Sequence, residues 1–209
     1  MRIRPFLPLA ALVFILTLSA KSSAQELRLT LDVGMSRPTG TDFDLYDYGY
    51  SVGANALFRI TENLRIGGRI AYNRWGPDEA EFLNRIDPFD IVDPDVEGDA
   101  AILEVVPIVR LMTNYPFSPV NFFAQVGAGL YVLNLRTTIT GSDGENQPLE
   151  WIFGEDSQYR FGTQLGAGFI FGSPDFLSVE LYPMFHLIFN NGENTFKFFS
   201  INLGVGLGI

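Results

Sequence analysis

The stretch Leu27-Arg-Leu-Thr-Leu-Asp-Val-Gly-Met-Ser36 alternates strictly: its odd positions hold Leu, Val or Met, and its even positions hold polar residues or glycine. Successive side chains of a β-strand point to opposite faces, so this period of two predicts a strand with one apolar and one polar face. Eight segments of the chain carry the same pattern. They are 27–37, 49–60, 64–75, 100–112, 120–136, 159–171, 177–189 and 196–209.

The connections between these segments alternate in length. Long connections span 38–48, 76–99 and 137–158, whereas 61–63, 113–119 and 172–176 are short, and the brief final connection falls on the long side. Short periplasmic turns alternating with long extracellular loops are typical of outer-membrane barrels. The sequence therefore predicts an all-β fold: an eight-stranded antiparallel up-and-down transmembrane β-barrel with both termini in the periplasm.

The first 24 residues have the layout of a signal peptide. Arg2 and Arg4 precede an apolar run over 6–18, and the small residue Ala24 predicts cleavage before Gln25. The alternative is an N-terminal helical anchor, although the run is short for a membrane-spanning helix. Residues 25–209 then form one barrel domain.

Composition excludes several classes of function. The formal charge is −10, and removal of the three leader cations lowers it to −13, which disfavours a nucleic-acid partner because a polyanion requires a basic face. The chain has no cysteine, so it has no disulfide framework and no thiolate chemistry.

Alternation alone also fits a soluble, lipocalin-like barrel with its apolar face inside. The polar face, however, is rich in Gly and Arg and poor in Lys and Glu, which suits a crowded lumen better than water. An eight-stranded barrel is just wide enough for side chains to fill it, and buried charges there must be paired. The predicted lumen charge network comprises Asp32, Arg65, Arg69, Glu104, Arg110, Arg160 and Glu180.

Aromatic residues gather near the ends of the predicted strands, where they are expected to form two interfacial girdles; ordinary β-propensity is the alternative explanation. The group toward the long loops is Tyr46, Tyr48, Tyr50, Tyr72, Trp75, Phe161, Phe189 and Phe196. The group toward the short turns is Phe58, Phe122 and Phe171.

Two prolines, Pro107 and Pro183, fall inside predicted strands. Proline removes a ladder donor, and a bulge that absorbed it would reverse the facing of the residues beyond it. The inward facing of Arg110 and His186 therefore depends on the local register.

The Gly-aromatic strands Gln125-Val-Gly-Ala-Gly-Leu-Tyr131 and Gln164-Leu-Gly-Ala-Gly-Phe-Ile170 give the chain its family resemblance. Over Gln25–Ile209 it resembles the small OmpA/OmpX-type outer-membrane β-barrel family. The resemblance implies a bacterial outer-membrane location and a structural or interaction role, with outer-membrane lipid and lipopolysaccharide as surroundings. Family members usually close with an aromatic residue, and this chain departs from that pattern at Ile209.

His186 is the only histidine, which excludes a two-histidine metal site. Some barrels that this chain resembles deacylate lipid A with a His, a Ser two residues later and an Asn. Here Ile188 stands at the serine position, so the attacking hydroxyl is missing. We therefore expect a hydrogen-bonded lumen histidine, no cofactor and no enzyme activity; a lipid A deacylase-like enzyme is the alternative.

The second long loop is strongly acidic. Asp93, Asp95, Glu97 and Asp99 place oxygen ligands at every second residue, and hard cations such as Ca²⁺ prefer oxygen ligands. The spacing does not match an EF-hand, and a solvated, self-repelling loop is the simpler interpretation. Divalent bridging to lipopolysaccharide phosphates is a third.

Binding residues concentrate on loops held by a rigid scaffold. Loops 38–48, 76–99 and 137–158 are thus the expected contact sites for an extracellular ligand or protein. In the third loop, Trp151, Ile152 and Phe153 form either an apolar contact patch or an extension of the β-ribbon beyond the membrane. A non-enzymatic barrel acting through its loops is the leading hypothesis, and a narrow pore is a further alternative.

Overall fold

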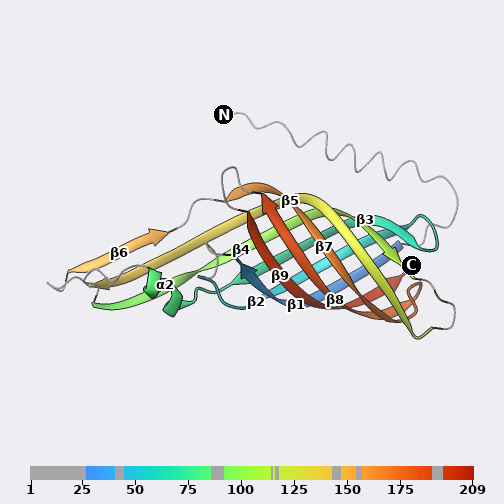
Figure 1. The fold of residues 1–209 in the computed structure, drawn as a ribbon, viewed down its shortest axis with the longest axis horizontal. Coiled ribbons are helices and arrows are strands. Elements are labelled where there is room, and N and C mark those ends of the chain that lie inside the picture. The colour runs from blue at the N-terminus through green and yellow to red at the C-terminus, as the bar shows by residue number, and fades with distance from the viewer. Residues whose placement is uncertain are drawn as a thin grey trace, which may run out of the picture.

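Eight antiparallel strands close into one barrel in the computed structural model (Figure 1). The structure describes residues 27–40, 45–85, 92–113, 115, 118–142, 147–153, 157–189 and 195–209. The predicted signal peptide and its cleavage before Gln25 lie outside these residues. The barrel strands are β1 (Leu27–Thr39), β2 (Gly49–Arg59), β3 (Leu64–Trp75), β4 (Val92–Met112), β5 (Val120–Ser142), β7 (Gln158–Gly172), β8 (Leu177–Phe189) and β9 (Phe196–Gly208). All eight predicted segments are strands, so the predicted fold class is confirmed.

The first and last strands close the barrel. β1 pairs with β9 from Arg28 opposite Gly208 to Thr39 opposite Lys197, and the backbones of Leu27 and Ile209 exchange hydrogen bonds of 3.0 and 2.8 Å. The barrel end where β1 begins and β9 stops is called the turn end below. β6 (Pro148–Phe153) lies beyond the opposite end, which is called the ribbon end (Figure 1).

The barrel is apolar outside and polar inside. Leu31 is 70% exposed on the outer face, whereas its neighbour Asp32 is 2% exposed in the lumen. The same alternation runs along β8 and β9, where every second residue is buried. A soluble barrel has the reverse arrangement, so the lipocalin-like alternative is wrong.

Neither strand proline shifts the register. The β4–β5 ladder lacks its pairs at Pro107 but resumes in the same register at Ile108 opposite Gly127. The β7–β8 ladder is likewise interrupted at Pro183 and continues unchanged on both sides. Both prolines point outward, so the residues beyond them keep their expected facing.

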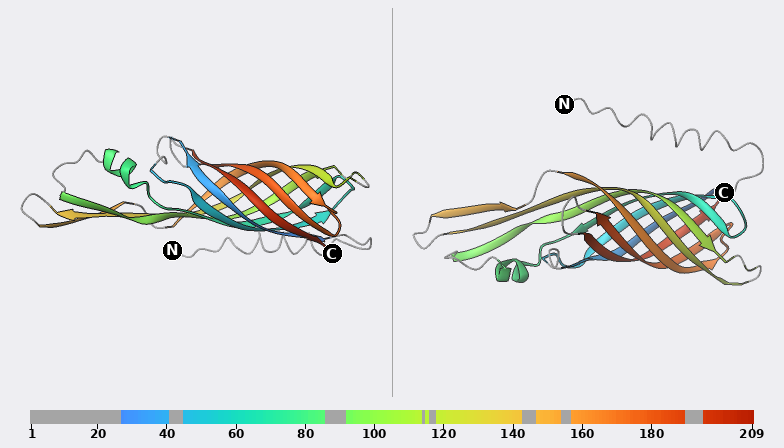
Figure 2. Two further views of the ribbon diagram at one scale, coloured as in Figure 1. Left: turned by 90° about the horizontal axis from the view of Figure 1, so that it is seen from below. Right: turned by 45° about the horizontal axis from the view of Figure 1, so that its top comes forward.

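β4 and β5 continue past the barrel and form a three-stranded ribbon with β6 (Figure 2). The far part of β4, residues 92–99, pairs with 137–142 of β5, and β6 pairs with the same part of β5. The expected loops 76–99 and 137–158 therefore contain sheet over 92–99, 137–142 and 148–153, and Trp151-Ile-Phe153 extends the ribbon. The short helix α2 (Glu79–Arg85) lies beside it. Among the described residues, no helix is long and apolar enough to cross a membrane.

The aromatic residues divide between the two faces. Tyr48, Tyr50, Tyr72, Phe161 and Phe189 are exposed toward the ribbon end, and Phe58, Phe122 and Phe171 toward the turn end. The expected placement of Tyr46, Trp75 and Phe196 on the outer surface is wrong, because all three are buried. Trp75 shares the strand parity of Arg69 and Asn73, which face the lumen.

Candidate functional site

The lumen gathers most of the charges that the sequence placed there. Asp32, Arg65, Arg69, Glu104, Arg110 and Glu180 are each 2% exposed or less. They come from four strands, β1, β3, β4 and β8. Arg160 is only half-buried and donates to Gln158 at the ribbon end, outside this buried group.

Glu180 on β8 binds two arginines from opposite sides. Arg28 Nη2 lies 2.7 Å from Glu180 Oε1, and Arg110 Nη1 lies 2.9 Å from Oε2. Arg110 also donates to Gln125 Oε1, and its guanidinium stacks 4.1 Å from the centre of the Phe123 ring. Both carboxylate oxygens are thereby occupied, which is the condition under which a buried charge is tolerated.

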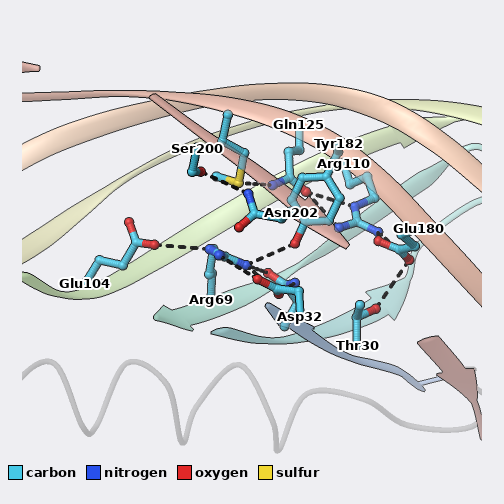
Figure 3. A network of polar contacts seen from close by, with 12 residues as sticks. Thr30, Asp32, Arg69, Glu104, Arg110, Gln125, Glu180, Tyr182, Ser200 and Asn202 are labelled. Carbon is cyan, nitrogen blue, oxygen red and sulfur yellow. Dashed lines mark hydrogen bonds and ion pairs between the residues drawn. The ribbon is translucent and has the colours of Figure 1, made fainter. Parts of the chain in front are cut away.

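Arg69 on β3 is the centre of a second cluster (Figure 3). Its Nη atoms donate to both carboxylate oxygens of Asp32 at 2.8 and 2.9 Å, and its Nε donates to Glu104 at 3.2 Å. Asn55 and Tyr182 complete the shell: Asn55 Oδ1 and the Tyr182 hydroxyl oxygen accept further bonds from Nη1. Paired contact with Asp32 fixes the guanidinium plane as well as its position.

His186 on β8 lies against the second carboxylate oxygen of Glu104, with Nδ1 and Oε2 3.1 Å apart. Its ring stacks on Phe198 at a centroid distance of 3.9 Å and an angle of 7°. Tyr131 meets it edge-on from β5. The imidazole is 1% exposed. The sole histidine therefore belongs to the packed lumen and not to the surface that meets lipid.

The contacts of Glu104 and Glu180 are reciprocal, and they follow an internal repeat of the sequence. Glu104-Val-Val-Pro-Ile-Val-Arg110 on β4 matches Glu180-Leu-Tyr-Pro-Met-Phe-His186 on β8 in the spacing of acid, proline and basic side chain. The acid of each copy meets the basic residue of the other. Between them, β5 and β7 carry Gln-x-Gly-Ala-Gly in a symmetric register, Gln125 opposite Gly166 and Gly127 opposite Gln164.

Sequence reasoning missed Arg28, Gln125, Asn55 and Tyr182 as members of the network. Their strand parity already placed them inside, and the repeated Glu-x-x-Pro-x-x-base spacing linked β4 to β8. Within the described lumen, Arg28, Arg69 and Arg110 balance the carboxylates of Asp32, Glu104 and Glu180. The fourth buried arginine, Arg65, is paired with Asp175 at the turn end. The charges of the interior are therefore balanced.

Side chains also occupy both ends of the lumen. At the turn end, Arg65 binds Asp175 at 2.6 Å, and Arg28 donates to Pro174 O. At the ribbon end, Trp75 packs edge-on against Phe198, 5.2 Å between ring centres, and is also packed against Phe196. With these charged side chains at one end and aromatic side chains at the other, the lumen has no broad channel of the kind seen in larger barrels.

The ribbon has a hydrophobic core that is continuous with the buried apolar residues at the ribbon end of the barrel. Phe82 from α2 is 4% exposed and packs edge-on against Tyr46, 5.7 Å between ring centres. Tyr46 lies within hydrogen-bond distance of Thr137 Oγ1, and burial raises the pKa of its phenol. Helix, connecting segment and β5 are thus held together, which makes the ribbon a defined surface.

The acidic candidates for a metal site lie along the ribbon. Asp95 and Glu97 are exposed on β4, Asp99 binds Arg74 at 3.1 Å, and the side chain of Asp93 lies outside the described residues. An extended strand spreads alternate residues apart instead of converging them. Among the residues that the structure describes, no cluster of three or more metal-ligating side chains is present.

Solved structures with the same architecture are small outer-membrane barrels. Neisserial surface protein A superposes with a TM-score of 0.52 at 14% identity, over 87% of this chain and 96% of that one. The chain is a small transmembrane β-barrel. Ail of Yersinia pestis gives a TM-score of 0.49 at 16% identity, over 90% of this chain and 100% of that one. The N-terminal barrel of Pseudomonas aeruginosa OprF gives 0.46 at 11%, over 88% and 98%.

No protein-family model matches the chain. No curated protein matches it either. At such low identity the structural likeness establishes the fold alone, and the role of this barrel has to be argued from its own surfaces.

Proposed function

We propose that this chain is a non-enzymatic protein of the bacterial outer membrane that binds an extracellular partner through its ribbon. The observation that carries the proposal is the joining of a lumen packed with paired charged side chains to a structured three-stranded projection. A barrel that neither conducts nor reacts through its interior still anchors and orients what projects from it. Binding residues are commonly presented in this way, on segments held by a rigid scaffold.

The two ends of the barrel support one orientation. The brief connections, the start of β1 at Leu27 and the end of β9 beside Ile209 lie together at the turn end. Outer-membrane barrels keep short turns and termini in the periplasm and carry their longer segments outside. The ribbon end therefore faces the extracellular medium, and Gln25 becomes the first residue of the exported protein after removal of the signal peptide.

β6 supplies a specific mode of binding. Among the described residues it pairs only with β5, so its outer edge is the margin of the sheet. An edge strand presents a row of backbone donors and acceptors that an extended segment of another protein can pair with. Ile152 is 58% exposed on this strand and offers an apolar contact beside the backbone. A partner segment in extended conformation fits this edge best.

The buried histidine supports a non-enzymatic role. His186 lies between Glu104 and Phe198, and Ile188 two residues later is 1% exposed and has no nucleophilic group. A lipid substrate on the outer face has no contact with either. Incubation with lipid A is expected to release no fatty acid; release that His186→Ala abolishes would overturn the non-enzymatic role.

The location is tested by fractionation of the producing cells, followed by protease treatment of intact cells. The protein is expected in the outer-membrane fraction, and protease is expected to trim the ribbon while the barrel stays whole. Recovery in the soluble periplasmic fraction without detergent, or a ribbon cut only after cell lysis, contradicts the proposal.

A further inference from the structure

Four cations stand on the outer surface of the barrel at its ribbon end. They are Arg37 on β1, Arg74 on β3, Arg136 on β5 and Lys197 on β9, and all four are exposed. Below we call this set the cation arc. On β1, Arg37 comes directly after the outward apolar residues Leu29 to Met35. On β9, Lys197 comes directly before the outward apolar residues Phe199 to Leu207. The arc therefore begins where the apolar belt stops.

The arc runs around most of the barrel and leaves out only β7 and β8. Arg37 and Lys197 lie diagonally across the β1–β9 ladder, in which Thr39 is opposite Lys197. Arg74 is opposite Ala101 in the β3–β4 ladder. Two residues before Ala101, Asp99 is opposite Arg136 in the β4–β5 ladder. The arc thus spans β9, β1, β2, β3, β4 and β5. The outward faces of β7 and β8, as far as the structure describes them, carry no charged side chain.

Tyrosine side chains lie next to the cations of the arc. The Arg37 guanidinium lies 4.7 Å from the Tyr48 ring centre, and its Nη1 donates to the Tyr48 hydroxyl at 3.2 Å. Tyr50 is opposite Arg74 in the β2–β3 ladder, and Tyr72 lies two residues before it. Tyrosine side chains concentrate where the hydrocarbon ends and the headgroups begin. The arc accordingly stands at headgroup height.

The arc carries excess positive charge. Among the described residues its one carboxylate partner is Asp99, which Arg74 Nε approaches to 3.1 Å. The mature chain as a whole is strongly acidic, so four cations on one outer stripe run against its overall charge. A cation facing hydrocarbon is costly, whereas a cation among anionic headgroups is attracted to them. The charge calls for an anionic partner in the membrane itself.

We propose that the cation arc binds the phosphate groups of lipid A, the membrane anchor of lipopolysaccharide, in the outer leaflet. This inference rests on the proposed function, since it requires the ribbon end to face outward. Guanidinium groups bind phosphate oxygens through two parallel hydrogen bonds, and the Lys197 ammonium adds a point charge. Because the outward faces of β7 and β8 lack such groups, lipid A is not held along these two strands.

Direct contact differs from divalent bridging. The acidic ribbon residues, Asp95 and Glu97 among them, lie farther from the membrane than the arc and would hold phosphate only through Ca²⁺ or Mg²⁺. The arc needs no metal ion. Binding by the arc therefore persists in the presence of a chelator, whereas bridging is lost.

The test uses the mature chain, refolded into phosphatidylcholine nanodiscs that contain diphosphoryl lipid A or its dephosphorylated form. Each measurement is made once in EDTA and once in Mg²⁺. Lipid A retained after detergent extraction is counted by native mass spectrometry. The variant replaces all four arc residues by Gln. Arg59→Gln is the matched control, because Arg59 pairs with Asp175 at the turn end. Heat-modifiable gel mobility verifies that each variant folds, and the double variant R37Q/K197Q serves if the fourfold variant does not.

The wild type and Arg59→Gln are expected to retain the diphosphoryl lipid in preference to the dephosphorylated one. Each arc residue removed lowers the binding constant about fivefold, as expected for a cation near an anionic surface. Equal retention of the two lipids, undiminished retention by the folded variant, or retention that requires Mg²⁺ overturns the proposal. These outcomes leave the location of the protein untouched, since fractionation tests that separately.

Discussion

Arg110 on β4 meets Glu180 on β8 at 2.9 Å, and the basic residue at the matching position of β8, His186, returns the contact to Glu104 on β4. β4 and β8 are therefore connected across the lumen by two contacts, one at each end of the repeated motif. Each acid also binds an arginine from a further strand, Arg28 for Glu180 and Arg69 for Glu104. Its contacts between β4 and β8, β1 and β8, and β1 and β3 connect strands that no ladder joins, so the network braces the barrel from within.

Glu180→Gln tests the energetic weight of this network. The substitution keeps the shape but leaves Arg28 and Arg110 buried without their carboxylate, and breaking a buried pair costs about 3–5 kcal/mol. Urea unfolding in lipid vesicles, followed by gel mobility, measures the loss. Glu97→Gln is the control, since Glu97 is exposed on the ribbon and its replacement is expected to cost less than about 0.5 kcal/mol. Equal stabilities of the two variants would show that the network is not structural.

Gly53→Ala tests how tightly the lumen is packed. A Cβ at this position stands 2.7 Å from Arg69 Nη2 and 2.8 Å from Asp32 Oδ1, so it displaces one of the two from their ion pair. Overpacking of this kind is expected to destabilise the barrel by about 1–3 kcal/mol in the same unfolding assay. Ala54→Val, on the neighbouring residue that faces outward, adds more volume and is expected to be tolerated. A larger loss for Ala54→Val would mean that the facing of β2 is reversed.

The filled lumen predicts that the barrel does not conduct. Trp75 and Phe198 close the ribbon end, and the Arg65–Asp175 pair closes the turn end. Planar-bilayer recordings of the refolded protein are expected to show no sustained current steps, with a porin as the positive control. Steady steps of one amplitude would restore the narrow pore as the function.

Phe82→Ala tests the core of the ribbon. The side chain joins α2 to Tyr46, and removal of a buried phenylalanine costs about 3–5 kcal/mol. The loss falls on the ribbon, because the barrel ladders do not involve this residue. Protease added to intact cells is expected to cut the variant faster, while barrel unfolding in urea stays as in the wild type. A simultaneous loss of barrel stability would show that ribbon and barrel fold as one unit.

Much of the barrel could be predicted from the period of two. In β1, the alternation of Leu29, Leu31 and Val33 with Thr30 and Asp32 fixes both the strand and its facing. The same parity argument, applied strictly, also places Trp75 and Phe196 inside; grouping aromatics by their nearness to strand ends concealed this. Strand facing is local and thus readable from the sequence.

The ribbon could not be predicted in the same way. Residues 92–99 contain five acids or prolines and resemble a solvated loop, yet they pair with the polar stretch 137–142 of β5. Outside the membrane neither face has to be apolar, so the hydrophobic alternation is lost while the ladder continues. Pairing across the lumen is also non-local: the partners of Glu104 and Glu180 depend on how the strands are staggered around the barrel.

The most direct test of the account is the sidedness of the two ends, and the absence of cysteine makes it clean. Single variants Glu150→Cys on β6 and Glu62→Cys at the turn end are treated in intact cells with a membrane-impermeant maleimide. We expect Glu150→Cys to be labelled at once in intact cells and Glu62→Cys to be labelled only after lysis. Labelling of Glu62→Cys in intact cells, or protection of Glu150→Cys, would contradict an outer-membrane barrel that presents its ribbon to the exterior.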